Sequence, residues 1–561
     1  MGNSYKTIAF LLLIIAIAST VFYVGNFDIF SSKYLINDDV RQQIFWMERW
    51  RDPQLFQNDF LTNYAQTYVP VGVKALYRLA SLKFDPLLFS NILTFILFVV
   101  TAVLWFEWGR AFGDNLTAFL LVVVYFLFTG FQYQMSGGLS RSFVFPLMIL
   151  YLLLVSQERL FLSGLVIFLQ SFFNPYVFLL CLCTHSLIML TKFGPALLTK
   201  IFPDFGNFPE SANSGMQTQK TALGILRELL VLNIPVIGGV LFTMASVIWY
   251  QSNTGHLISW REMIGRSEYS ELGRYQLYPD PSFFYELIRP WIFNLSFPYW
   301  GPVAGWFMVL VVIGVFGYAT LNYQPVIKWK SLQGLLILIF ASLLLYVIAR
   351  LFLVRLFVPR RYINYTLNLV YCIGFAVALR ILFEKMNLNR LRLYIVLIAL
   401  LVFACFKGRH IEIFDYSSGF NLYKFIGTTP KNVLIAGWPE TMDDVMTFGK
   451  RRAFVTYKLS HTWVEPFWSE VKKRTFDFFK AYYSSDPEEI RSFCKANHID
   501  YLVVRLKDFE PERLKRTDPY FEPFNGFIWY LANSRNHFAA LDRKSFPPVF
   551  EEDGIRVLQF K

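Results

Sequence analysis

Charged residues are scarce in this chain. Asp, Glu, Lys and Arg make up 17% of its 561 residues, whereas soluble domains carry about 25%. Hydrophobic residues make up 55% and aromatic residues 19%, including 60 Phe and 31 Tyr. This composition excludes a disordered chain, and it predicts a polytopic membrane protein whose aromatic rings lie against lipid and at its interfaces.

Cysteines and metal-ligand spacings are also few. The five cysteines are scattered along the chain, so they indicate neither a disulfide framework nor a paired metal-ligand spacing. No cluster of His, Cys and carboxylate residues has the spacing of a metal site. The sequence therefore does not predict a particular cofactor. A divalent cation, if bound, would need Asp38 or Asp39 together with a residue of a distant loop.

The net charge of +13 could suggest a nucleic-acid partner. In a membrane protein, however, basic residues more often flank the spans or meet anionic lipid. We therefore expect membrane lipid as a partner and no nucleic acid. Nothing in the sequence points to a particular protein partner.

Eleven apolar runs are each candidates for a membrane-spanning helix. They cover residues 7–25, 87–106, 117–131, 142–156, 160–173, 176–191, 229–250, 301–322, 331–349, 363–382 and 393–407. Several are shorter than the roughly 20 residues that cross a bilayer as a straight helix, and short or broken spans usually border a cavity. Asn174-Pro175-Tyr176 splits the pair at 160–191. The alternative is one long kinked helix there, which would change the count.

Residues 1–407 are thus expected to form a mainly α-helical transmembrane domain of about 11 helices, with two large polar loops at 26–86 and 251–300. In the first of these, Ile44, Phe45, Met47 and Trp50 could lay an amphipathic helix on the membrane surface. A flexible loop is expected at 203–209, where Pro, Asn and Gly gather.

After about residue 408 no apolar run is long enough to span a membrane. Short buried strands are predicted at 433–435, 501–504 and 555–558, and Ser485-Asp486-Pro487-Glu488-Glu489 has the features of a helix start. We predict that residues 408–561 form a soluble α/β domain. This segment holds neither a phosphate-binding glycine loop nor a Gly-x-Ser-x-Gly elbow, so we assign it no chemistry of its own.

An odd number of spans puts the loops at 26–86 and 251–300 on the same side of the membrane as the terminal domain. Lys and Arg are distributed too evenly between the two sides for the positive-inside rule to decide the orientation. We take the side of these loops to be external. The prediction is then a multi-pass protein of the cell (inner) membrane with an extracytoplasmic C-terminal domain, and an anionic ligand would explain the arginines on that side.

The most suggestive polar cluster follows the first span, at Asn37-Asp38-Asp39-Val40-Arg41. Adjacent carboxylates diverge in any regular structure, so one can act as a general base or bind a metal while Arg41 holds the other. At the membrane surface they could meet a lipid-borne substrate. The alternative is that an acidic pair at the end of a span is a solvated loop or a helix cap.

Three further polar motifs fall on the same predicted side. Glycines allow close backbone approach, and arginine forks match phosphate oxygens, so together the motifs could bind a phosphate or pyrophosphate head group. Taken singly, each arginine could instead be an interfacial residue that snorkels. The motifs are Ser136-Gly137-Gly138-Leu139-Ser140-Arg141, the stretch from His256 to Arg274, and residues 355–362, and their candidate ligand-binding residues are Arg141, His256, Arg360 and Arg361.

An acidic pair after the first span, a long first external loop, several short middle spans and a terminal α/β domain together resemble the C-type glycosyltransferase superfold. Members of that superfold transfer a sugar from a polyprenyl-phosphate carrier on the outer side of the membrane, and an acidic residue of the first external loop serves as base or metal ligand. The resemblance implies that Asp38 and Asp39 hold this catalytic position and that a lipid-linked sugar donor is the partner.

One further likeness and one missing motif bear on this resemblance. Residues 137–143 and 359–362 also look like segments of uncharacterised multi-span bacterial membrane proteins of this general shape. The Trp-Trp-Asp motif of the oligosaccharyltransferase branch is absent from the terminal domain, so transfer to a protein sequon is not implied.

Two other function classes stay open. A transporter of a lipid-linked substrate would also use broken helices and polar groups within the membrane, although few ionisable residues fall inside the apolar runs and no internal repeat is evident. A non-catalytic scaffold or assembly protein would use the terminal domain to bind a partner.

Overall fold

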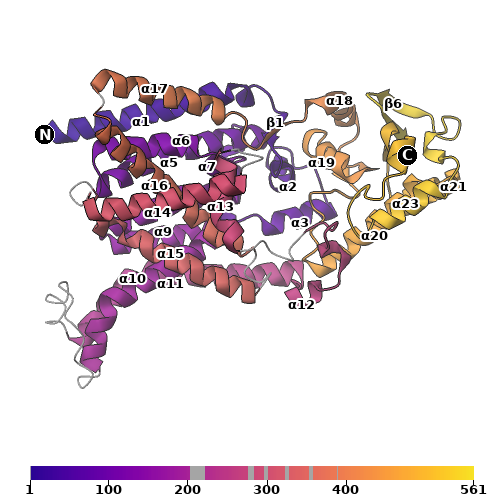
Figure 1. Cartoon of the computed structure of the whole chain (residues 1–561). Helices are drawn as coiled ribbons and strands as arrows, with labels where there is room; N and C mark the ends of the chain where they lie inside the picture. Colours follow the sequence, from indigo (N-terminus) through magenta and orange to yellow (C-terminus); the bar gives the residue numbers. More distant parts are fainter. Residues whose placement is uncertain are drawn as a thin grey trace.

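The computed structural model describes residues 2–201, 221–275, 283–295, 301–322, 327–352, 358–387 and 389–560. A bundle of long helices forms one part of the molecule, and a mixed α/β region that ends at the C-terminus forms the other (Figure 1). The N-terminus lies at the end of the bundle that is remote from this C-terminal region. The predicted loop at 203–209 and residues 355–357 of the third motif lie outside the described residues.

The bundle contains a helix at each of the eleven predicted apolar runs. These helices and α13, which lies within the predicted second polar loop, are α1 (Gly2–Asn26), α5 (Pro86–Phe112), α6 (Asn115–Leu127), α7 (Thr129–Met135), α8 (Val144–Ser156), α9 (Leu160–Phe173), α10 (Pro175–Ile201), α11 (Ala222–Thr254), α13 (Phe283–Leu295), α14 (Gly301–Asn322), α15 (Trp329–Leu351), α16 (Arg360–Lys385) and α17 (Arg390–Lys407). The protein is therefore mainly helical and polytopic, as the composition predicted.

The predicted count of eleven spans is not supported. Among the described residues, six helices are long and apolar enough to cross a membrane, namely α1, α5, α10, α11, α15 and α16. The helices α6 and α7 meet at a bend of 66° and would together make a seventh span. With 13 and 14 residues, α8 and α9 are too short, since a helix rises 1.5 Å per residue and the hydrocarbon core is about 30 Å thick.

The break at Asn174 makes α9 and α10 two helices rather than one kinked helix. The Asn174 side chain accepts hydrogen bonds from the backbone N–H groups of Tyr176 and Val177, at 3.1 and 3.2 Å. It therefore caps the start of α10, whose first residue is Pro175. Proline is tolerated at this position because its missing N–H would have no partner in the first turn.

The first polar loop contains five short helices and one strand. They are the 3-10 helix η1 (Phe27–Phe30), β1 (Leu35–Asn37), α2 (Val40–Gln43), the 3-10 helix η2 (Phe45–Trp50), α3 (Phe60–Tyr68) and α4 (Val71–Ala80). The predicted surface helix corresponds to η2, but Phe45, Trp46 and Met47 are buried in the protein. Burial against the rest of the chain thus takes the place of the expected contact with the membrane.

The C-terminal region is built on a five-stranded mixed sheet in the order β4-β3-β5-β7-β6. The strand β3 pairs in parallel with β4 and β5, while β7 pairs antiparallel with β5 and β6. The predicted strands correspond to β3, β5 and β7, and the predicted helix start to α21. The elements are β2 (Ile413–Asp415), α18 (Phe420–Thr428), β3 (Leu434–Gly437), α19 (Pro439–Phe448), β4 (Arg452–Ala453), α20 (Glu465–Tyr482), α21 (Pro487–Ala496), β5 (Tyr501–Arg505), α22 (Pro511–Leu514), α23 (Asn525–Asn533), β6 (Pro548–Glu552) and β7 (Ile555–Gln559).

The segments that follow the first and the last helix of the bundle are joined by a small antiparallel sheet. The helices α1 and α17 lie side by side (Figure 1), and a Cβ added at Gly25 would lie 2.8 Å from the carbonyl oxygen of Cys405. This close approach lets β1, which follows α1, pair with β2, which follows α17, so that Ile36 lies opposite Phe414. The segment after α17 therefore pairs with the first polar loop, which follows α1.

The second polar loop also contacts the C-terminal region. Ile258 donates a backbone hydrogen bond to Trp463 at 3.1 Å, and Arg266 forms an ion pair with Glu465 at 2.6 Å. Short helix α12 (Trp260–Met263) lies beside α20 in this contact (Figure 1). The described part of this loop, the first polar loop and the C-terminal region thus meet at one end of the bundle.

These contacts predict a topology that labelling can check. In a chain whose own cysteines are replaced, Gln57→Cys in the first loop and Lys515→Cys in the C-terminal region should react with an impermeant thiol reagent from the same side. Met386→Cys, after the far end of α16, should react from the opposite side. All three positions are exposed. Labelling of Gln57→Cys and Lys515→Cys from opposite sides would contradict the shared face.

Candidate functional site

The acidic pair lies in a turn that a buried asparagine fixes. The Asn37 side chain donates hydrogen bonds to Ser136 Oγ at 3.2 Å and to the Glu412 carbonyl at 2.9 Å. Its Oδ1 accepts a hydrogen bond from the backbone N–H of Asp39 at 3.0 Å. A short polar side chain that bonds to the backbone two residues on stabilises such a turn. Asp38 and Asp39 therefore stand at a defined place just before α2.

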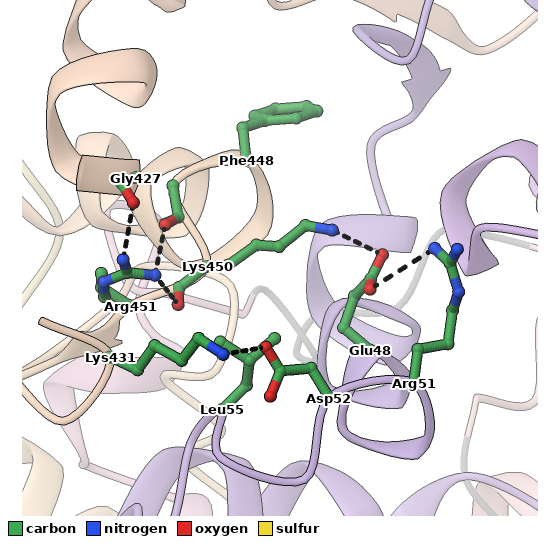
Figure 2. Close-up of a pocket in the computed structure, with 10 residues that line it drawn as sticks. Glu48, Arg51, Asp52, Leu55, Gly427, Lys431, Phe448, Lys450 and Arg451 are labelled. Atoms are coloured by element: carbon green, nitrogen blue, oxygen red, sulfur yellow. Dashed lines mark hydrogen bonds and ion pairs between the residues drawn. The ribbon is translucent and has the colours of Figure 1, made fainter. Parts of the chain in front are cut away.

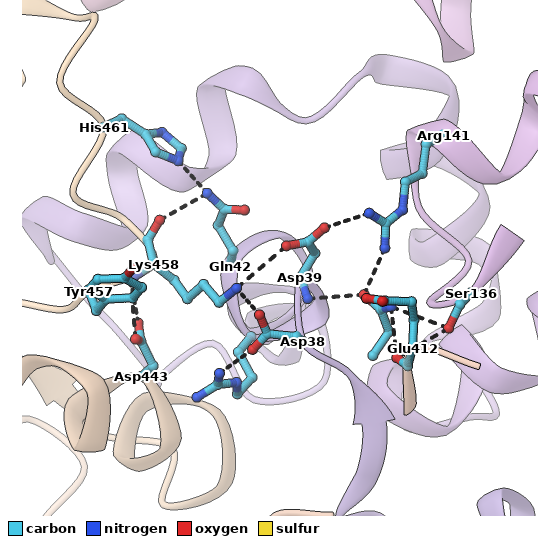
Figure 3. A network of polar contacts seen from close by, with 12 residues as sticks. Asp38, Asp39, Gln42, Ser136, Arg141, Glu412, Asp443, Tyr457, Lys458 and His461 are labelled. Atoms are coloured by element: carbon cyan, nitrogen blue, oxygen red, sulfur yellow. Dashed lines mark hydrogen bonds and ion pairs between the residues drawn. The ribbon is translucent and has the colours of Figure 1, made fainter. Parts of the chain in front are cut away.

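Asp38 is held by two cations from different parts of the chain. Its carboxylate forms ion pairs with Arg41 of α2 and with Lys458 of the C-terminal region (Figure 3). It also accepts a hydrogen bond from the Tyr416 hydroxyl at 3.0 Å. Burial alone would raise the pKa of Asp38, but the charges of Lys458 and Arg41 outweigh it and lower the pKa to about 2. Asp38 is ionised at any physiological pH.

Asp39 has a close cationic partner at one oxygen and a more distant one at the other. Its Oδ2 lies 2.8 Å from Arg141, whereas its Oδ1 lies 3.6 Å from Lys458 Nζ, beyond hydrogen-bond distance. The charge of Asp39 acts on Tyr68 of α3, on Tyr275 and on Arg361 of α16. Asp39 thus lies where the first loop, the second loop and the start of α16 come together.

The predicted glycine motif brings Arg141 to this pair. Gly137 and Gly138 have positive φ angles of 90° and 59°, which L side chains rarely adopt. A Cβ added at Gly137 would lie 2.9 Å from Asn37 Cβ, so the motif can approach the acidic turn only without a side chain there. Arg141 donates to Asn37 Oδ1 at 3.1 Å, and its buried Nε has no hydrogen-bond partner among the described residues.

The C-terminal region contributes side chains that the sequence analysis did not assign to the site. Asp444 of α19 lies 2.6 Å from Arg41, and the neighbouring Asp443 accepts the backbone N–H of Lys458 at 3.1 Å. Asp443 is buried, and burial raises its pKa to about 7, with Asp444 acting in the same direction and Arg41 against it. No local motif marks these residues, because their role depends on contacts across the whole chain.

His461 connects the same loop of the C-terminal region to the first loop. It contacts the Tyr64 hydroxyl of α3 at 2.8 Å. It also contacts the side-chain amide of Gln42, which in turn donates to the Lys458 carbonyl at 2.9 Å (Figure 3). Burial, together with the charges of Arg274 and Lys458, lowers the pKa of His461 to about 3. The imidazole is therefore neutral, and it positions Gln42 rather than carrying charge.

The remaining predicted residues lie further from the acidic pair. Arg361 is exposed and its guanidinium lies 4.9 Å from the centre of the Tyr176 ring, while Arg360 is the first residue of α16. His256 is exposed and contacts Glu262 at 3.0 Å in the second loop. The structure thus brings Asp38, Asp39, Arg41 and Arg141 into one network. Arg361 lies close enough to feel the charge of Asp39. His256 lies in a separate contact with Glu262.

The donor set of a divalent cation is incomplete at this network. Within the described residues, no group of three or more His, Cys, Asp and Glu side chains could hold a metal ion. Glu412 supplies its main-chain carbonyl to the Asn37 turn, and the ammonium of Lys458 already lies beside both carboxylates. The residues present do not fit the divalent cation that the sequence resemblance allowed.

A cleft of about 410 Å³ lies between the first loop and the C-terminal region (Figure 2). Its cations pair with its own acids: Lys450 lies 2.9 Å from Glu48, and Lys431 lies 2.6 Å from Asp52. Arg451 donates to backbone carbonyls of its own region. Glu48 is buried, and burial raises its pKa to about 7. Because these charges are matched within the cleft, we interpret it as a contact that fastens the first loop to the C-terminal region.

No protein-family model matches the chain, and no curated protein matches it. Among solved structures, it is similar to the apo oligosaccharyltransferase of Archaeoglobus fulgidus, with 12% identity and a TM-score of 0.49 over 94% of this chain and 72% of that one. It is also similar to the A. fulgidus oligosaccharyltransferase in complex with an inhibitory peptide and a dolichol-phosphate, with 10% identity and a TM-score of 0.47 over 91% and 71%.

The resemblance to the C-type glycosyltransferase superfold predicted a likeness of this kind. With identities of 10–12% and TM-scores below 0.5, the likeness carries no conclusion about activity. The function is therefore taken from the side chains of the site.

The buried Asp443 predicts a pH dependence of stability. Its pKa is about 7 in the folded protein, above the ordinary value of 3.8, so folding favours the protonated form. Stability should therefore fall as pH rises from about 4 to 7, with the full loss present above pH 7. In Asp443→Asn, which still accepts a hydrogen bond from Lys458, the decrease in melting temperature from pH 5 to pH 8 should be smaller.

The measurement is thermal unfolding of the purified full chain across this pH range. Asp518→Asn is the control, since Asp518 is exposed in the same region. An equal slope of melting temperature against pH in wild type and Asp443→Asn would contradict the assignment.

Proposed function

We propose that this chain is a membrane glycosyltransferase that transfers a sugar from a polyprenyl-phosphate donor to an acceptor at the outer face of the membrane. The observation that carries the proposal is the adjacent acidic pair, framed by Arg41, Arg141 and Lys458, at the end of the helical bundle. Transfer of this kind needs a carboxylate that takes a proton and cations that hold a departing phosphate.

Asp39 is our choice for the general base. Its Oδ1 is free of hydrogen-bond partners at normal distance, while Arg141 fixes Oδ2 and thereby the orientation of the carboxylate. In the reaction, the acceptor hydroxyl passes its proton to Asp39 while its oxygen bonds to the anomeric carbon. The bond from that carbon to the phosphate oxygen breaks, and polyprenyl phosphate leaves with the bonding electrons.

Asp38 has a different role in this proposal. Its low pKa, about 2, makes it a weak base. Its charge instead holds Arg41 and Lys458 in place, so it orders the site around Asp39. This division agrees with the expectation that only one member of an adjacent acidic pair can face the acceptor.

Two arginines are the candidates for the phosphate. Arg141 has a buried Nε–H without a partner, and an unsatisfied buried donor is costly unless a ligand or water accepts from it. Arg361 is exposed at the start of α16 and feels the charge of Asp39. Arg41 supports the pair from the other side, and Arg360 and His256 stay candidates for weaker contacts with the substrate.

The same proposal covers the placement of the protein. We infer that the C-terminal region, residues 408–561, is a soluble extracytoplasmic domain and that the chain resides in the cell (inner) membrane. Its contacts with the first loop and with residues 256–266 support a shared side for all three. The external assignment follows from the need to meet a lipid-linked sugar there.

The two aspartates should separate in mutagenesis. Asp39→Asn should lower turnover by roughly 10²–10⁴ with little change in melting temperature, because it removes general-base assistance and keeps the shape. Asp38→Asn should lower the melting temperature, because it removes the partner of two cations that are largely shielded from solvent. The measurement is release of polyprenyl phosphate from a panel of polyprenyl-phosphate sugars by the chain in membranes, beside thermal unfolding.

Asp415→Asn is the matched control, since Asp415 is an exposed acid on the nearby strand β2. It should keep both turnover and stability. Full turnover in both Asp39→Asn and Asp38→Asn would overturn the glycosyltransferase proposal in favour of a scaffold or a transporter.

The phosphate site makes a separate prediction. Arg361→Ala should weaken binding of a short-chain polyprenyl phosphate about tenfold or more, since a charge-assisted hydrogen bond contributes roughly 1.5–3 kcal/mol. Binding to the purified chain in nanodiscs measures this. Arg350→Ala is the control, because Arg350 is an exposed arginine near a tyrosine ring at the end of α15. Equal affinity in both variants would mean that Arg361 only snorkels.

A further inference from the structure

Lys458 occupies a place between the two carboxylates of the acidic pair. Its ammonium forms an ion pair with Asp38 Oδ2 and lies 3.6 Å from Asp39 Oδ1 (Figure 3). Its side chain is only 14% exposed, so it has little freedom to leave for solvent. A cation that faces one oxygen of each carboxylate stands where a divalent metal ion would bridge them.

The backbone of Lys458 is fixed from both sides. Its N–H donates to both carboxylate oxygens of Asp443 at 3.1 Å, and its carbonyl accepts from Gln42 at 2.9 Å. Asp443 belongs to the C-terminal region, whereas Gln42 belongs to the first loop. The position of the ammonium is therefore set by the docking of these two parts.

The cations of the network are already paired with carboxylates. Arg41, Arg141 and Lys458 face Asp38, Asp39 and Asp444, and the carboxylates of Asp443 and Glu412 act on the same charged groups. A divalent ion at the pair would have to displace Lys458, whose ammonium lies beside both carboxylates. Without Lys458, the two carboxylates together with water could hold such an ion.

We propose that Lys458 is the built-in cation of this site and takes the place of a divalent metal ion between Asp38 and Asp39. Lys458 is a positioning residue: it holds Asp38 ionised and sets the orientation of the pair. Docking of the C-terminal region therefore completes the site. The placement of the cation stands on geometry alone, and only its effect on turnover rests on the proposed function.

Binding of Mn²⁺ to the purified full chain, followed by electron paramagnetic resonance, tests the placement directly. Wild type should bind no Mn²⁺ at the acidic pair, so its titration should match that of the Asp38→Asn/Asp39→Asn double variant. Lys458→Ala frees both carboxylates and should gain one Mn²⁺ per chain. That gain should be lost when Asp38→Asn is added.

Lys450→Ala is the matched control. Lys450 also comes from the C-terminal region and pairs with two carboxylates of the first part of the chain, Glu48 at 2.9 Å and Asp85 at 3.7 Å, but it lies outside the site. It should not change Mn²⁺ binding at Asp38 and Asp39. If Lys458→Ala does not fold, the comparison of wild type with the double variant still decides.

Turnover supplies the second readout. Release of polyprenyl phosphate by wild type should be unchanged by EDTA, whereas Lys458→Ala should lose most of it and regain a part with added ethylammonium, which can enter the vacated place. Wild type that shows no release at all would count against the proposed function but would leave the Mn²⁺ experiment to decide the role of Lys458.

Two results would overturn the inference. One is stoichiometric Mn²⁺ binding by wild type that Asp38→Asn abolishes, because the lysine would then yield to a metal. The other is a folded Lys458→Ala chain that gains no Mn²⁺, because the lysine would then not occupy a metal place.

Discussion

The buried amide of Asn37 is the interaction on which the site depends. Its four polar partners come from the acidic turn itself, from Ser136 and Arg141 after α7, and from Glu412 after α17. A buried amide is stable only when its donors and acceptors are satisfied, so these three segments must come together for any of them to be placed. The contacts of Asn37 therefore determine where Asp38 and Asp39 lie.

Electrostatic matching then joins the helical bundle to the C-terminal region. The acids of the first loop meet Lys458 and Lys450, and Arg41 of the first loop meets Asp444. Removing one partner of such a buried pair leaves an uncompensated charge, which costs more than the pair itself contributes. Ion pairs therefore hold the first loop and the C-terminal region together, in addition to the apolar packing around them.

The sequence predicted the elements better than their assembly. Hydropathy found every helix of the bundle that it named, because apolar runs report burial wherever they lie, but it could not tell the short α8 and α9 from true spans. The acidic pair could be recognised because it follows the first apolar run, and Arg141 because it follows two glycines at the start of a short apolar run. Lys458, Asp444 and His461 could not be recognised, because a lysine or an acid in an α/β region carries no local sign that it reaches a loop some 400 residues away. His256 was grouped with the site by topology, yet its nearest charged partner is Glu262 of its own loop.

The pairing of β1 with β2 fixes the order in which this protein can be completed. Asn37 and Glu412 are separated by 375 positions, and synthesis at about 5–20 residues per second delays their contact by tens of seconds at least. During that interval Lys458 has not been made, and Asp38 and Asp39 have only Arg41 and Arg141 as cationic partners. A prematurely terminated chain that ends before the C-terminal region would therefore lack the third cation of the network.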